Sequence, residues 1–268
     1  MFQEYSSFLL QLLSRCVDEQ CIDLLVRDLL KLYERANENG VMNEELFSER
    51  VTFFLSIGEM KKAREIAEQG ISTFKDSLAM MKLRFQTEIL CFTSENACNS
   101  ENTKKILCND LSALLAGVLD KTTKSEELFD VWILLKNYFV LSSSDITIVS
   151  KYFKKILFQN PVDVHLIKED ALRFVVFQFG IHQGRILFKE SRSYPPTKLT
   201  LYDQMIHFEL SQPEPNKTTI RDLFEQSTLE KSAENHPDLF IRFVQHELHC
   251  RNFEKVQALY WKAKKILK

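Results

Sequence analysis

The 268-residue chain carries 35 Lys and Arg against 37 Asp and Glu, and 45% of its residues are apolar. The formal net charge of −2 excludes a field that would hold the whole domain on nucleic acid regardless of sequence. Six Gly and six Pro are too few for the many turns of an all-β protein, so helices are favoured.

Apolar residues recur along the chain in the pattern of tandem helical pairs. In the second helix of each pair, the first, fourth and fifth positions of a short motif are apolar and share one helical face. The fifth position is held, in chain order, by Tyr33, Ala67, about Cys108, Phe153, Phe188, Phe224 and Tyr260. Successive fifth positions are 34 to about 45 residues apart, which is the period of paired-helix solenoids.

We therefore predict an all-α protein, a right-handed superhelical solenoid of about seven helix-turn-helix repeats. The solenoid is expected to be a single domain over residues 1–268. The predicted repeats are residues 1–38, 42–75, 78–118, 126–159, 163–193, 198–230 and 237–268.

The N-terminal repeats are the less regular ones. Residues 1–5 begin inside a first helix, with Phe2 and Tyr5 as its core aromatics, whereas an end repeat normally carries a polar cap. We therefore expect the chain to be a fragment of a longer protein. Gly58 is expected to end the first helix of the second repeat, and the motif copy near residues 104–111 is degenerate.

The last three repeats are the most regular. Their second-helix motifs begin 36 residues apart and share the order small or aliphatic, polar, any, Leu, aromatic. We predict that the leucines of this motif are buried at equivalent sites; they are Leu187, Leu223 and Leu259. Gly180 is expected to end a first helix, residues 212–216 to separate the two helices of the sixth repeat, and Pro237 to exclude helix just before the last repeat.

Two first helices carry an aromatic residue or Met at positions i and i+3 and Glu at i+7. The two sets are Tyr202, Met205 and Glu209, and Phe240, Phe243 and Glu247. All three positions lie on one helical face, and we interpret Glu247 as the structural acid of its repeat. The Glu is clear in these two repeats alone, which leaves the registers of the third and fifth first helices open.

Two second helices resemble the half-a-TPR (HAT) repeat family. Leu-Tyr-Glu-Arg-Ala at residues 32–36 and Ala-Arg-Glu-Ile at residues 63–66 match the stretch that this family carries on its second helix. The family's first-helix Trp is present only as Trp132, and Phe2, Tyr202 and Phe240 stand in its place in three other repeats. The resemblance covers nearly the whole chain and implies a paired-helix scaffold.

Within this family, the order and detail of the motifs are similar to a component of the small-subunit processome. That similarity implies a scaffold role in nucleolar assembly of the early small ribosomal subunit and in processing of its RNA precursor. It implies partners among the protein subunits of a ribonucleoprotein complex, β-propeller proteins among them, in the nucleus and nucleolus. Two alternatives stay open: direct binding of RNA, or a HAT scaffold in messenger RNA 3′-end processing or splicing.

The sequence contains no recognisable constellation of catalytic or metal-binding residues. His246 and His249 fall one residue short of the His-Glu-x-x-His spacing that holds a metal, so both are expected at a solvated helix edge. The glycines form no phosphate loop, and no two cysteines have the spacing of a zinc site. We predict no enzymatic activity, no metal, no cofactor and no small-molecule substrate. We also predict no membrane partner, because no apolar run nears about 18 residues.

The candidate partner contact lies on the last second helix, at Trp261, Lys262 and Lys265. Equivalent sites in other repeats hold charged residues that avoid burial, so we expect Trp261 to be at least partly exposed and to belong to a contact surface. The alternative is that it packs as the terminal cap, against a preceding helix or a missing C-terminal extension. Interleaved aromatic and basic residues also suggest RNA base stacking, but the helical phase places Phe153 and Tyr260 in the core and leaves the lysines for RNA contact.

Overall fold

The computed structural model describes residues 2–95, 112–121, 125–141, 146–159, 164–195 and 197–267. These residues form helices and the turns between them, with no strand among them. The all-α prediction is confirmed. The chain divides into two compact units, Met1–Thr122 and Thr123–Lys268.

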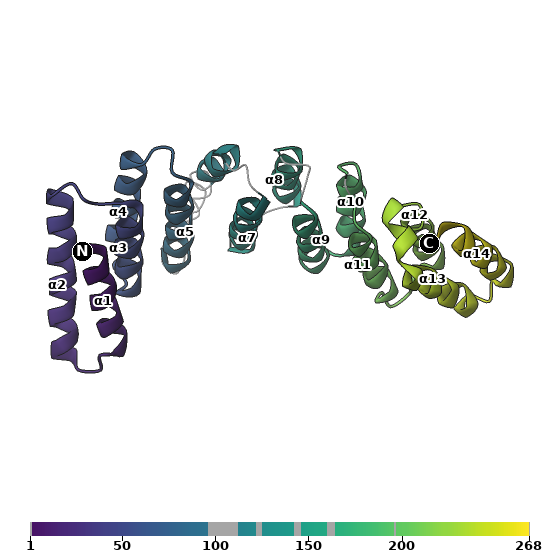
Figure 1. Cartoon of the computed structure of the whole chain (residues 1–268), viewed down its shortest axis with the longest axis horizontal. Helices are drawn as coiled ribbons and strands as arrows, with labels where there is room; N and C mark the ends of the chain where they lie inside the picture. Colours follow the sequence, from purple (N-terminus) through teal and green to yellow (C-terminus); the bar gives the residue numbers. More distant parts are fainter. Residues whose placement is uncertain are drawn as a thin grey trace. The chain divides into compact units, whose positions relative to one another are not determined.

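The first unit is built from helices that pack against their neighbours in the sequence. Its helices are α1 (Phe2–Arg15), α2 (Glu19–Glu38), α3 (Glu44–Ser56), α4 (Met60–Thr73) and α5 (Leu78–Glu95), and residues 112–121 are also helical. The most extensive packing joins α1 to α2, α3 to α4 and α4 to α5 (Figure 1). Tyr33 and Phe53 meet in the core of this unit, with ring centroids 6.3 Å apart.

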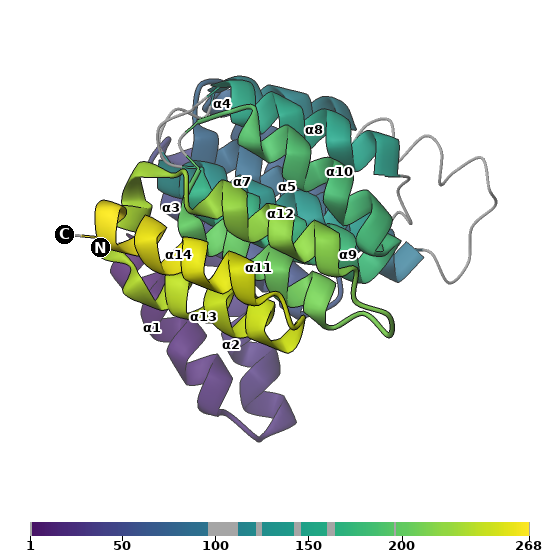
Figure 2. The ribbon, with the colours of Figure 1, turned by 90° about the vertical axis from the view of Figure 1, so that its right-hand side faces the viewer.

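The second unit has the same pairwise arrangement. Its elements are α7 (Ser125–Leu141), α8 (Ile146–Gln159), α9 (His165–Phe179), α10 (Ile181–Arg192), α11 (Leu199–Leu210), α12 (Lys217–Ser227), the 3-10 helix η1 (Lys231–Asn235), α13 (Pro237–His249) and α14 (Phe253–Ile266). The helices pair as α9 with α10, α11 with α12 and α13 with α14 (Figure 2). The first helices of successive pairs can also be in contact, and α9 packs against α11 in this way. Trp132 is fully buried and packs edge-on against Phe153 and Phe174.

Local sequence explains where several helices begin and end. Gly58 and Gly180 have φ angles of +78° and +85°, which side chains with a Cβ rarely adopt, and they follow α3 and α9 as predicted. Gly180 is the single residue between α9 and α10, whereas residues 211–216 separate α11 from α12. The Asn216 side chain caps α12 by accepting from two backbone N–H groups, and Pro237 occupies the first turn of α13.

The regular second helices have the predicted register. Leu187, Leu223 and Leu259 are 2%, 6% and 2% exposed, so the prediction that they occupy equivalent buried sites is confirmed. Phe153 is fully buried, also as predicted. The apolar stripe of α8, α10 and α12 is therefore the one predicted from the spacing of residues, whereas in α14 only Leu259 is buried.

Two aromatic residues expected in the core lie at the surface instead. Tyr260 is 61% exposed, although Phe188 and Phe224 at the equivalent positions are buried. Those two rings are covered by the first helix of the following pair, and no helix of the described ranges covers Tyr260 in that way. Tyr5 is half-exposed because the buried face of α1 passes through Ser6, one position further along.

One predicted motif cannot be placed. The degenerate copy near residues 104–111 lies outside the described residues, so its prediction as a second helix stays untested, although residues 112–121 just after it are helical. In the parts of the chain that the structure describes, no helix has the length and apolar character needed to span a membrane.

Candidate functional site

Ion pairs between an arginine and a buried glutamate join successive helical pairs. Glu209 of α11 accepts two hydrogen bonds from Arg185 of α10, with Nε–Oε1 and Nη2–Oε2 distances of 2.6 and 2.8 Å. Glu247 of α13 is held in the same way by Arg221 of α12, again at 2.6 and 2.8 Å. Both glutamates are fully buried, so each pair fixes one layer of helices on the next. The structural role predicted for Glu247 is confirmed by this geometry.

A third pair of this kind involves Glu88 of α5, which the first-helix pattern did not reveal. Arg64 of α4 places its Nε 3.1 Å from Glu88 Oε1, and the acid is buried. The polar Arg84 stands four residues before Glu88, where the clear repeats have an apolar residue. The sequence does signal this pair through the arginine of the second helix, α4. Arg64 precedes Glu88 by 24 residues, which is also the spacing from Arg185 to Glu209.

Burial and pairing act in opposite directions on these carboxyl groups. Burial alone would raise the pKa of Glu247, but the hydrogen bonds and positive charge of Arg221 outweigh burial, and the pKa lies below its usual value. At Glu88, burial outweighs the charges of Arg64 and Arg84, and the pKa is raised. The bidentate pair therefore keeps Glu247 ionised to lower pH.

We expect Glu247 to make the second unit sensitive to acid. The pKa of Glu247 is lower in the folded chain than in the unfolded chain, where it is near 4.5. Ionised Glu247 therefore stabilises the fold at pH values above 4.5, and this stabilisation is lost as the pH falls through the pKa of the folded state. The gap in unfolding free energy between the parent chain and Glu247→Gln should narrow from neutral pH to about pH 4. Urea unfolding followed by circular dichroism measures this gap, and a gap independent of pH contradicts the prediction.

Aromatic contacts accompany the ion pairs of the second unit. Phe188 of α10 packs edge-on against Tyr202 of α11, with ring centroids 5.4 Å apart. Phe224 of α12 stacks on Phe243 of α13 at 5.0 Å. In both layers the fifth motif residue of a second helix is covered by the first helix of the next pair, which is how these layers join.

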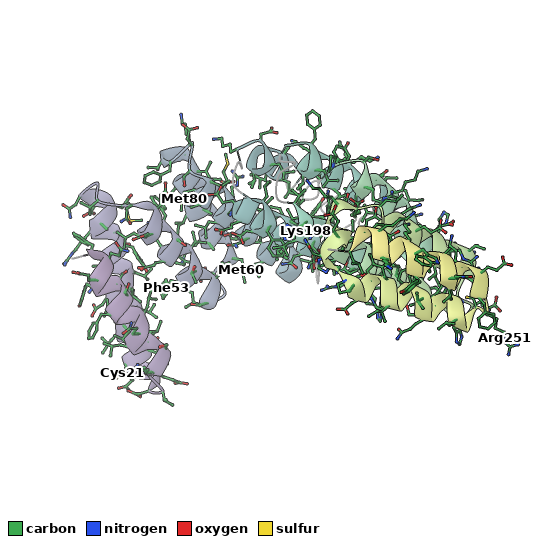
Figure 3. The ribbon with its side chains drawn as sticks, turned by 45° about the vertical axis from the view of Figure 1, so that its right-hand side comes forward. Cys21, Phe53, Met60, Met80, Lys198 and Arg251 are labelled. Carbon is green, nitrogen blue, oxygen red and sulfur yellow. The ribbon has the colours of Figure 1, made fainter. Side chains whose placement is uncertain are left out.

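The outer face of α14 consists of Gln257, Tyr260, Trp261 and Lys264. Tyr260 and Trp261 are 61% and 53% exposed, and their rings meet edge-on with centroids 5.5 Å apart. Lys264 Nζ lies 5.5 Å from the centroid of the Trp261 ring, within the range of a cation–π contact. Arg251, labelled in Figure 3, marks the turn that joins α13 to α14. This face thus presents two adjacent aromatic rings to solvent.

The structure separates the three residues predicted to contact a partner. Trp261 is exposed, as predicted. Lys262 turns back onto its own unit, where its Nζ donates to Thr228 Oγ1 at 2.7 Å and burial lowers its pKa. Lys265 is exposed on the last turn of α14. Trp261 and Lys265 are therefore accessible to a partner, whereas Lys262 is engaged within the chain; a role in partner contact stays a prediction for all three.

A groove of about 990 Å³ opens beside α11 and α13 in the second unit. Lys198, labelled in Figure 3, is one of its lining residues and comes just before α11 in the sequence. Two charged residues of its lining form a hydrogen-bonded ion pair, in which Arg242 Nη2 donates to Asp203 Oδ1 at 2.5 Å. Glu230 in its wall accepts from the Tyr202 hydroxyl at 2.7 Å. The lining of the groove thus carries both basic and acidic side chains.

His246 and His249 have different surroundings. His246 is half-buried against Phe224, with ring centroids 5.8 Å apart, and burial lowers its pKa. His249 is exposed. The expectation of a solvated edge is therefore right for His249 and wrong for His246, which covers the edge of a buried aromatic ring. Across the described ranges, no three His, Cys, Asp or Glu residues gather in a way that could hold a metal ion.

Comparison with known proteins finds one family over the whole repeat array. The family model described as U3 small nucleolar RNA-associated protein 6 C-terminal matches residues 1–267. The chain is 21% identical over 237 residues to the U3 small nucleolar RNA-associated protein 6 homolog of Mus musculus, and 22% identical over 243 residues to that of Homo sapiens. These alignments cover 88% and 89% of this chain and 37% of each relative. The chain thus spans little more than a third of their length.

Two solved structures are also similar to the chain. The C-terminal part of a TPR repeat-containing protein from Cytophaga hutchinsonii gives a TM-score of 0.45 at 10% identity, covering 98% of this chain and 95% of that one. The human IFIT1 dimer with PPP-AAAA gives a TM-score of 0.41 at 14% identity, covering 91% of this chain and 53% of that one.

Proposed function

We infer the function from one premise: the chain belongs to the family of the U3 small nucleolar RNA-associated protein 6 C-terminal region. We propose that it is a non-catalytic scaffold for protein–protein interaction in a nucleolar ribonucleoprotein assembly, the small-subunit processome. In that assembly it would act in ribosome biogenesis, in processing of the small-subunit ribosomal RNA precursor. The observation that carries this proposal is the family match over residues 1–267.

The geometry of the helical layers supports a scaffold role. Bidentate Arg–Glu pairs and aromatic contacts fix successive layers of the second unit against each other. Stacked helical pairs of this kind offer surfaces whose parts keep fixed spacing, as a protein that positions several partners requires.

The proposed partners are protein subunits of the same particle. The resemblance to the HAT family adds β-propeller proteins to this proposal, and the nucleus and nucleolus as its location. We also propose that residues 1–268 form a single repeat domain, a proposal that the family match over residues 1–267 supports.

A pull-down from nuclear extract tests the proposed function. The affinity-tagged chain should recover U3 small nucleolar RNA together with protein subunits, well above its recovery of the spliceosomal U1 RNA, as measured by quantitative reverse transcription PCR. Equal recovery of the two RNAs would show the proposal to be wrong, and enrichment of splicing or 3′-end processing factors would favour the corresponding alternative.

A second measurement separates a protein scaffold from an RNA-binding solenoid. Purified chain is titrated with single-stranded RNA at increasing salt. Because counterion release makes electrostatic RNA binding fall steeply with salt, tight and strongly salt-dependent binding would favour direct RNA contact. The protein scaffold predicts little binding of arbitrary RNA at physiological salt.

A further inference from the structure

We propose that two adjoining hollows in the second unit bind a short segment of single-stranded RNA, with one base stacked on Phe177 and neighbouring phosphates in the groove beside α11 and α13. This inference goes beyond the proposed scaffold function, because it adds a local RNA contact to a protein scaffold. It is carried by the side chains that line the two hollows.

The first of these is an aromatic hollow of about 420 Å³ between α9 and α11. Phe177 of α9 is 74% exposed, and its ring meets that of Phe208 of α11 edge-on, with centroids 5.9 Å apart. Phe208 packs against the buried core of the unit and so supports Phe177. The lining residues of this hollow are Arg173, Phe177, Asp203, Gln204, His207 and Phe208.

Phe177 is exposed although its helix has neighbours on both sides. α9 packs against α7, the first helix of the preceding pair, and against α11, the first helix of the following pair. Because repeats of a solenoid contact only their neighbours, further layers at either end of the array would not cover this ring. The exposure of Phe177 is therefore a property of this surface.

The side chains around Phe177 match the chemistry of a nucleobase. Bases of single-stranded RNA stack on aromatic rings and on the guanidinium plane of arginine, and their edges form hydrogen bonds. Arg173 and His207 are exposed beside the two rings, and the acid of the hollow, Asp203, is engaged by Arg242. An aliphatic side chain of a partner protein would use the aromatic ring but neither of these polar groups.

The second hollow is the groove of about 990 Å³ beside α11 and α13, and Asp203 lines both hollows. The groove exposes the basic side chains of Lys198, Lys231 and His236 and one exposed acid, Asp238. Lysines beside an aromatic platform are the arrangement that holds the phosphates of a strand whose base is stacked. A strand with one base on Phe177 would therefore place neighbouring phosphates toward these lysines.

A pair of RNA probes separates base stacking from phosphate binding. The first probe is fluorescein-labelled octauridylate, and the second is an octamer with the same backbone whose nucleotides are all abasic. Fluorescence anisotropy with the full 268-residue chain measures binding at low salt, because a few phosphate contacts bind only weakly at physiological salt. We expect octauridylate to bind about tenfold more tightly than the abasic octamer, the effect of one stacked base.

Variants of the two hollows should change different parts of this binding. Phe177→Ala should abolish the preference for octauridylate, and Phe177→Tyr, which keeps an aromatic ring, should retain it. Lys198→Ala combined with Lys231→Ala should weaken the binding of both probes and leave the preference unchanged. Phe253→Ala removes another exposed ring, 68% exposed on α14, and should alter neither.

Three results would overturn the inference. These are equal binding of the two probes by the parent chain, a preference for octauridylate that survives Phe177→Ala, and binding unchanged by the double lysine variant. Equal binding of the probes, together with loss of a protein subunit from the nuclear pull-down by Phe177→Ala, would assign the surface to a protein instead. Since the anisotropy assay contains no nuclear particle, its outcome does not depend on the proposed processome role.

Discussion

Replacing Arg221 by Ala is expected to lower the free energy of unfolding by about 3 kcal/mol, because it leaves a buried carboxylate without its partner. Glu247 is fully buried and receives both of the Arg221 hydrogen bonds, at 2.6 and 2.8 Å. The estimate is at the lower end of the usual range, since the Arg221 side chain is 27% exposed and water can reach its place. Urea unfolding followed by circular dichroism measures the loss.

A second ion pair of the same unit provides the control for this prediction. Arg242 binds Asp203, but their side chains are 44% and 37% exposed, so Arg242→Ala should cost about 0–1 kcal/mol. The double variant Arg221→Met with Glu247→Met should recover much of the loss, because it removes both charges and fills their space with apolar atoms. Equal costs for Arg221→Ala and Arg242→Ala would show that the buried pair does not hold the layers.

Replacing Leu223 by Ala is expected to cost about 2–5 kcal/mol, the range for removing a buried leucine and leaving a cavity. Leu223 is 6% exposed and belongs to the core that α11, α12 and α13 share. The interior is close-packed, so neighbouring side chains can refill the space only in part. Thermal or urea unfolding of the variant gives the loss directly.

An exposed leucine nearby distinguishes packing from a general effect of truncation. Leu229 is 76% exposed, and Leu229→Ala should change the free energy of unfolding by no more than about 0.5 kcal/mol. Leu187→Ala, at the equivalent site one layer earlier, should behave like Leu223→Ala. A Leu223→Ala variant as stable as the parent would mean that the repeat register is wrong.

The fold was largely predictable because helical register and helix ends are local properties. The spacing of Leu187, Leu223 and Leu259 defines one face of a helix without reference to the rest of the chain. Gly58 and Gly180 mark helix ends for a reason equally local, since few other residues accept a positive φ.

The candidate surface was less predictable because exposure depends on what lies against a helix. The local pattern gives Tyr260 and Phe224 the same position, but a ring of the following helix covers Phe224 and not Tyr260. The exposure of Trp261 was predictable, because the equivalent sites in other repeats hold charged residues. The bond from Lys262 to Thr228 joins residues 34 apart in the sequence, and no local pattern contains it.

The connection between α9 and α10 and the loop between α11 and α12 differ in how well they tolerate inserted residues. Gly180 alone joins α9 to α10, so an inserted residue there would have to displace one of the packed helices. Residues 211–216 are mostly exposed, and lengthening such a loop costs only a closure entropy that grows slowly with length. A short epitope inserted at Glu214 would therefore mark the position of this unit inside a large particle while leaving the ion pairs between its layers intact.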